Sequence, residues 1–334
     1  MYEFASAVID VWEKRILSHN DQDRMLSAPD RASSFMVLFD TDLAETASAT
    51  EDIEKIFEND FQLLKEKLTD ILDDHGRLVN YLFLFFDVWN LKMALKRQLL
   101  KSKLFPGEPL VCSLTAYEKL KVRVSEIWQK GASFNNDSGL KNMALLNTCL
   151  EKIIYLTQQT LVKSPIIDSA QIETAVDKAY FEVKQGAAKR ISPFLAELSC
   201  LEIDVANLKG LLSHNNEGFI EGGNLKIQEA RKLLESCQGE ISEENLEKFL
   251  EILNFSFLIK DFINTKSEII LEQGLQAFLS RRVFEKSRAT ACGLEKVLAF
   301  FYRKMNSHFN IRLILFAKDN NLPQTDIENL LLPI

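Results

Sequence analysis

The chain has 334 residues, a net charge of −8 and 46% hydrophobic residues, which is enough apolar material for a buried core. An acidic chain lacks the broad basic surface that phosphate backbones require, so we expect no nucleic-acid partner. Its five cysteines are widely scattered, without a Cys-x-x-Cys pair, which argues against a zinc knuckle or a redox motif and is typical of the reducing cytosol.

Hydropathy predicts no transmembrane segment. The most apolar window, residues 81–86, is far shorter than the roughly 18 residues that a membrane span needs. No signal sequence is recognisable at the N-terminus. Any association with a membrane is therefore expected through another protein or at the membrane surface.

Only seven prolines and twelve glycines interrupt the chain, and we predict an all-α fold. The expected helices, in chain order, cover residues 3–19, 48–103, 113–130, 139–163, a long helix after Asp168, a helix from Pro193 to about residue 213, then 225–237, 242–255, 260–285 and 292–318. Two capping boxes are predicted, at residues 48–51 and 168–171, and residues 325–328 should cap a final short turn. Glycine-rich residues 218–223 should form a turn.

The pattern Asn-(Leu/Ile)-(Lys/Arg)-x-x-Leu occurs three times, starting at Asn90, Asn207 and Asn310. The copies are 117 and 103 residues apart, close to a third of the chain, which indicates three repeats. Asp87 and Asp204 precede the first two asparagines by three residues, and the third copy has a serine there.

An apolar stripe supports the same repeats. In the middle copy the apolar residues step by four and three, the spacing of one helix face, and the first copy repeats the pattern. The third copy interrupts it with Lys304 and His308. We predict repeats at residues 1–104, 105–217 and 218–334, allowing first-helix segments to pack on a neighbouring repeat. The matching stripe residues are Phe194, Leu198, Leu201, Val205, Leu208 and Leu212, and Tyr81, Leu84, Val88, Leu91 and Leu95.

Charge is segregated along the first third of the chain. Residues 40–74 hold twelve acidic against three basic residues, whereas residues 92–103 hold five basic residues and no acidic one. Two interpretations stay open. The charges form solvated faces and complement a helix C-terminus, or they dock onto a charged partner.

A search for catalytic motifs gives no active site. Asp70, Asp73 and Asp74 share one helical face and could hold a magnesium ion, but a second acidic motif is missing, which favours a solvated face. The four histidines are isolated, and residues 218–223 lack the Lys-Ser/Thr of a phosphate loop. We therefore expect no catalytic residue, metal, cofactor or small-molecule substrate.

Several segments resemble a known family. The threefold helix ending, residues 175–181 and 202–209, and residues 310–318 followed by Leu322-Pro323 resemble the C subunit of prokaryotic V-type and A-type rotary ATPases, called subunit d in eukaryotes. Residues 219–225 resemble the turn between repeats in that family, and the likeness covers essentially the full length. Ser213 stands where an arginine is common, and residues 8–12 lack the usual arginine of the first helix.

The resemblance implies three pseudo-threefold-related helical repeats in a funnel-like arrangement between the membrane rotor ring and the central shaft. The chain would be a non-catalytic torque adaptor, cytoplasmic and held at the membrane by its complex. The interruption at Lys304 and His308 would let one side hold an asymmetric shaft.

Eleven residues are candidates for repeat-signature or interface positions. The asparagines are expected to be structural, bonding neighbouring backbone or bridging to an adjacent helix. The basic residues divide between pairing within the domain and contact with partner subunits. The set is Asp87, Asn90, Lys92, Lys96, Arg97, Lys101, Asp204, Asn207, Lys209, Asn310 and Arg312.

Two other functions remain as alternatives. A generic helical scaffold for a cytosolic assembly would keep the repeats but lose the ring and shaft partners. An all-helical metal-dependent enzyme would require magnesium at Asp70, Asp73 and Asp74.

Overall fold

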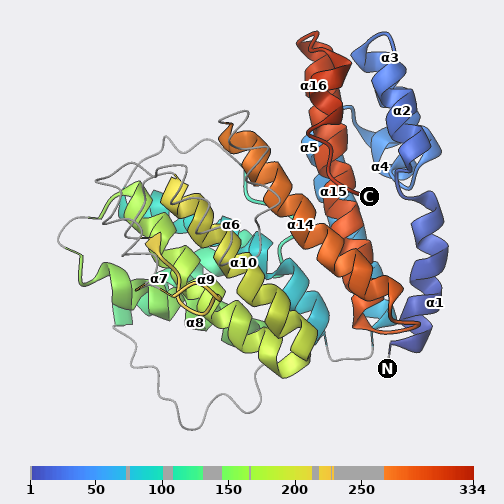
Figure 1. The fold of residues 1–334 in the computed structure, drawn as a ribbon. Helices are drawn as coiled ribbons and strands as arrows, with labels where there is room; N and C mark the ends of the chain where they lie inside the picture. The colour runs from blue at the N-terminus through green and yellow to red at the C-terminus, as the bar shows by residue number, and fades with distance from the viewer. Residues whose placement is uncertain are drawn as a thin grey trace. The chain divides into compact units, whose positions relative to one another are not determined.

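The computed structural model describes residues 2–72, 76–100, 108–130, 145–164, 167–212, 218–226, 228 and 267–334. Two compact units make up the chain. Unit 1 comprises Met1–His75 and Lys260–Ile334, and unit 2 comprises Gly76–Ile259. The described residues form helices and contain no strand, which confirms the predicted all-α class (Figure 1).

Unit 1 is organised around α15. This long helix packs against α1, α2, α3 and α14, and Figure 1 shows the N-terminal helices in blue beside it. The helices of unit 1 are α1 (Glu3–Trp12), η1 (Glu13–Arg15), α2 (His19–Ser27), α3 (Arg31–Met36), η2 (Val37–Asp40), α4 (Ala44–Ala49), α5 (Ile53–Ile71), α14 (Glu268–Arg288), α15 (Leu294–Asp319) and α16 (Gln324–Glu328).

The N-terminal part of unit 1 differs from the sequence prediction. The helix expected over residues 3–19 ends earlier, because Ser18 and Asp21 form a capping box that starts α2. The capping box expected at residues 48–51 is wrong. Asp52 caps α5 instead, accepting hydrogen bonds from the backbone N–H groups of Glu54 and Lys55.

Two further boundaries differ. The helix predicted over residues 48–103 is two helices, and Gly76, at the N-cap of the second, has a φ of 73° that glycine adopts without strain. The final short helix α16 exists, but it starts after Pro323 without a side-chain cap. The helices predicted at 225–237 and 242–255 lie outside the described residues, apart from residues 225, 226 and 228 of the first.

Unit 2 is built on α9, which contacts α6, α8 and α10. The capping box of Asp168 and Gln171 is confirmed, and Pro193 opens α10 as expected. The helices are α6 (Arg77–Leu99), α7 (Tyr117–Lys130), α8 (Leu145–Leu161), α9 (Ser169–Ile191) and α10 (Pro193–Leu212).

The predicted stripe of α6 faces the core of unit 2. Leu84, Val88, Leu91 and Leu95 are buried and pack with apolar residues of α7, α8 and α9. Among the described helices, α6 alone is long and apolar enough to cross a membrane, yet 78% of its most apolar window is buried inside the protein. That burial is typical of a core helix.

Candidate functional site

Each signature asparagine clamps the backbone of a segment that follows its helix. The side-chain amide of Asn90 donates to the carbonyl of Leu110 (3.0 Å) and accepts from the N–H of the same residue (2.8 Å). Asn207 holds Ile220 in the same way, at 2.8 and 2.7 Å. Asn310 holds Leu332 by two bonds of 2.8 Å.

All six hydrogen bonds are made to backbone groups within the chain, but the partners differ from those expected. Each amide pairs both its donor and its acceptor with one distant residue, rather than with a neighbouring turn or helix. All three side chains are buried, on α6, α10 and α15. The three asparagines therefore occupy equivalent settings.

The signature aspartates add a second attachment point in the first two copies. Asp87 Oδ1 accepts from the backbone N–H of Thr115 at 2.9 Å. Asp204 Oδ1 accepts from Leu225 at 3.0 Å, and its Oδ2 accepts from the Asn224 side chain at 2.7 Å. In both copies this point lies five residues after the clamped one. Burial raises the pKa of Asp204 more than these hydrogen bonds lower it.

The glycine-rich segment is a turn pressed against Asp204. A Cβ on Gly223 would lie 2.2 Å from Asp204 Oδ1, so the close approach of the two requires glycine. Gly222 has a φ of 106°, and its carbonyl accepts from Gln185 at 2.5 Å. The turn predicted at 218–223 is confirmed.

Several signature cations pair within their own unit. Lys92 lies 2.6 Å from Asp177, and Lys96 pairs with Glu173. Both carboxylates lie on α9. Arg97 donates to the hydroxyl of Tyr117 at 3.1 Å.

In unit 1, Arg312 binds both carboxylate oxygens of Glu54, each at 2.6 Å. Lys209 lies on α10, and Lys101 falls outside the described residues. Pairing within the unit thus accounts for Lys92 and Arg312, and contact of the set with partner subunits stays a prediction.

Lys304 and His308 interrupt the third stripe but do not reach the surface. Lys304 Nζ lies 2.8 Å from Asp42 Oδ2 and 2.6 Å from Asp60 Oδ2, and its side chain is 3% exposed. His308 Nε2 lies 2.8 Å from the same oxygen of Asp60, and its side chain is 5% exposed. Both residues therefore contact carboxylates inside unit 1, and the expectation that the interrupted stripe lets one side hold an asymmetric shaft stays a prediction.

The buried charges shift one another's protonation. Burial alone would raise the pKa of Asp60, but Lys304 and then His308 lower it to about 2. Burial opposes the charge of Lys304, but Asp60 and Asp42 outweigh it and raise the pKa. For His308 burial prevails over the attraction of Asp60, so its pKa is lowered.

Unit 2 contains a second buried cation. Lys184 Nζ lies 2.6 Å from Glu202 and over the rings of Tyr81 and Tyr180, 5.2 and 5.4 Å from their centroids. Burial disfavours this charge, yet Glu202 and Tyr180 raise the pKa of Lys184 above its ordinary value. The pair joins α9 to α10.

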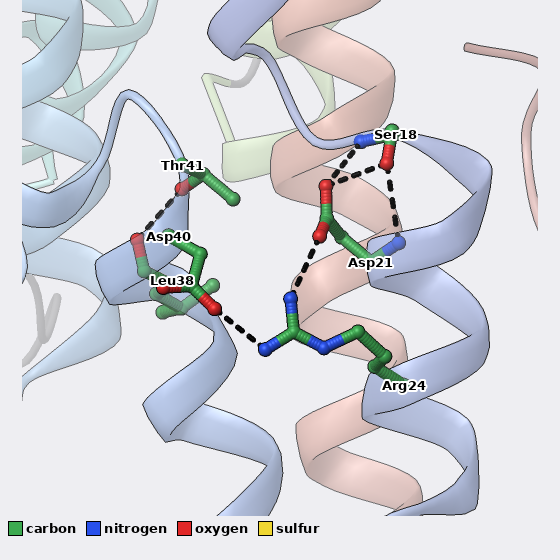
Figure 2. A network of polar contacts seen from close by, with 6 residues as sticks. All are labelled: Ser18, Asp21, Arg24, Leu38, Asp40 and Thr41. Carbon is green, nitrogen blue, oxygen red and sulfur yellow. Dashed lines mark hydrogen bonds and ion pairs between the residues drawn. The ribbon is translucent and has the colours of Figure 1, made fainter.

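Part of the acidic segment is paired internally. Figure 2 shows Arg24 between Asp21 and Asp40, at 3.2 and 2.5 Å, while Asp21 also completes the capping box with Ser18. Thr41 donates to the carbonyl of Leu38 at the end of η2, at 2.8 Å. With Asp42, Glu54 and Asp60, at least four of the twelve acids are therefore engaged within unit 1.

The candidate magnesium site is only partly described. Asp70 is exposed at the end of α5, and Asp73 and Asp74 lie outside the described residues. Within the described ranges, no group of three His, Cys, Asp or Glu residues is placed to hold a metal ion.

The family pattern described as ATP synthase (C/AC39) subunit matches residues 5–330. The chain belongs to this family. The match confirms the resemblance seen in the sequence and makes the chain a V/A-type rotary ATPase subunit of the C/AC39 family. All three signature asparagines of this C/AC39 subunit lie within the matched range, whereas the clamped Leu332 lies just beyond it. No curated protein sequence matches the chain.

Some contacts within this C/AC39 subunit were not predicted. The clamped residues Leu110, Ile220 and Leu332 have no sequence feature that marks them. Nothing in the sequence distinguishes Asp42 and Asp60 from the other acidic residues of the segment 40–74. Lys304 inside an apolar helical stripe was a usable signal, because a buried cation requires a carboxylate partner.

Proposed function

We propose that the protein is the non-catalytic central-stalk subunit that couples the rotating shaft of the soluble ATPase motor to the membrane rotor ring. The family match over residues 5–330 gives the type of complex. The observation that carries the coupling role is the asparagine clamp, found three times at intervals of about a third of the chain. Three copies of one local structure suit a part that seats coaxially on a ring.

The same observation supports three repeats, at residues 1–104, 105–217 and 218–334, arranged about one axis as a funnel. Within unit 1, α1, α2 and α3 from the predicted first repeat pack on α15 from the predicted third. This packing agrees with first-helix segments that cross to a neighbouring repeat. It would also close the series of repeats rather than leave two free ends.

A torque adaptor must transmit force without yielding, and the clamps suit this task. Each one ties the C-terminal half of a long helix to the segment that follows it through two hydrogen bonds from a buried asparagine. Such bonds are short-ranged and directional, so displacing the segment breaks both together. The internal ion pairs of Lys92, Lys184, Lys304 and Arg312 brace the same helices against their neighbours.

The proposal places the protein in the cytoplasm, held at the membrane through the ATPase complex, with shaft subunits on one side and the rotor ring on the other. Affinity purification of the tagged chain from mild detergent tests these partners. We expect the shaft subunits and the ring to elute with it in fixed ratio. Elution with neither, or with an unrelated cytosolic assembly, would favour a generic scaffold instead.

A further inference from the structure

A ladder of alternating aromatic and charged side chains joins α5 to α15 in unit 1. On α15 it consists of Lys304, His308 and Arg312, which are four residues apart and therefore share one helix face. On α5 it consists of Glu54, Phe57 and Asp60, with Phe61 beside them, and Asp42 reaches it from the segment after η2. We call this set the α5–α15 ladder.

His308 lies at the centre of the ladder, between two aromatic rings. Its ring is stacked on Phe57, with the centroids 4.1 Å apart and an angle of 13° between the planes. It meets Phe61 edge-on at 4.7 Å. The guanidinium of Arg312 lies 5.2 Å from the centroid of Phe57, so this one ring contacts both a cation and the imidazole.

The surroundings of His308 suit the neutral imidazole. Its Nε2 and the Nζ of Lys304 approach the same oxygen, Asp60 Oδ2, at 2.8 and 2.6 Å. A charged imidazolium would therefore sit next to the ammonium that already occupies this carboxylate. Neither ring nitrogen of His308 makes an aligned hydrogen bond with any described residue, so a proton on Nδ1 would be a buried donor without an acceptor there.

We propose that the α5–α15 ladder is an acid-sensitive latch. At neutral pH it holds α5 on α15, and protonation of His308 loosens α5 from α15 while the helices of unit 2 stay packed.

The direction of the effect follows from linkage. Burial, ahead of the opposing attraction of Asp60, lowers the pKa of His308 from its ordinary value of 6.5. Below that value the unfolded chain binds more protons than the folded one, so the free energy of unfolding of unit 1 falls as the pH falls. Two of the charged groups that act on His308, Asp60 and Lys304, do not titrate in this range. The pKa of Asp60 is about 2, that of Lys304 is raised, and Asp42 pairs with Lys304.

Hydrogen–deuterium exchange of the full chain tests the latch. Exchange should be followed at pH 7.5, 6.5 and 5.5, with times scaled for the intrinsic chemical rate. We expect the protection of α5 to fall by up to about tenfold for each unit by which the pKa of His308 is depressed. Protection of α9 in unit 2 should stay constant and serves as the internal reference.

Two variants sharpen the experiment. His308→Gln removes the titrating group, so the exchange of α5 should no longer depend on pH. His19→Gln removes a histidine that is exposed on α2 and should keep the wild-type response. Constant protection of α5 in the wild-type chain, or an unchanged pH response in His308→Gln, would overturn the proposal.

A second measurement needs no variant. The ring protons of His308 should show a ring-current shift from Phe57, which distinguishes them in the NMR spectrum from those of the other three histidines. Their titration should lie below pH 6.5 and coincide with the loss of α5 protection. A titration at or above 6.5 would refute the latch even if His308→Gln does not fold.

Discussion

Among the signature contacts in unit 2, the loss of the clamp that Asn207 forms should destabilise the protein most. Asn207→Ala removes both hydrogen bonds to Ile220 and leaves its N–H and C=O without partners. Ile220 is 6% exposed, so water cannot easily replace the amide. An unpaired buried group costs about 1–3 kcal/mol, and the two together predict a loss of about 2–6 kcal/mol.

The first clamp provides a graded comparison within the same unit. Asn90→Ala frees the backbone of Leu110, which is only partly buried and can turn to water. This variant therefore loses only the net contribution of two hydrogen bonds to the free energy of unfolding, about 1–3 kcal/mol. The destabilisation should therefore be smaller for Asn90→Ala than for Asn207→Ala.

Urea unfolding followed by circular dichroism measures the loss of stability in both variants. Hydrogen exchange of residues 218–226 shows where the chain loosens in Asn207→Ala. Glu221→Ala, an exposed change next to the clamped residue, is the matched control and should alter stability by less than about 0.5 kcal/mol. Equal effects of the two asparagine variants, or an Asn207→Ala protein as stable as the control, would refute the clamp argument.

Three further predictions follow from the described contacts. Leu208 is fully buried, so Leu208→Asp should bury an unpaired charge at a cost of several kcal/mol, unfold unit 2 and abolish ion transport while the soluble motor still hydrolyses ATP; retained transport would contradict it. Lys96→Glu should lower the stability of unit 2, and the double variant with Glu173→Lys should restore that stability if Lys96 serves pairing within the unit. If the double variant still assembles weakly with the ATPase complex, Lys96 would instead be assigned to a contact with a partner subunit. The isolated chain should not bind ATP, because no phosphate loop is present in the sequence; stoichiometric, micromolar binding in calorimetry would show otherwise.

The sequence predicted the parts of the fold that depend on local signals. The apolar stripe of α6 and the capping box at Asp168 were found because their period and spacing determine the structure directly. The capping box at residues 48–51 failed because Asp52 offered a competing cap a few residues later. The short helices between residues 19 and 49 have no long apolar period, and α2 and α3 form against α15, which no local pattern reveals.

For each contact of the site, the sequence predicted only one of the two partners. The repeated pattern located the asparagines and aspartates, but their partners are chosen by the tertiary fold and include ordinary backbone groups. The pairing of Lys304 and His308 inside unit 1 was not predicted, because their carboxylate partners lie in the N-terminal quarter of the chain. Burial of a charge and exposure of a charge look alike in a sequence until the partner is known.

The coupling role can be tested most directly on sealed membrane vesicles that carry the rotary ATPase with and without this subunit. ATP hydrolysis and ion uptake should be measured on the same preparation. The account predicts that, without the subunit, the soluble motor still hydrolyses ATP but the vesicles no longer take up ions, and that adding the wild-type chain restores uptake. Vesicles that accumulate ions normally in its absence would contradict the coupling role.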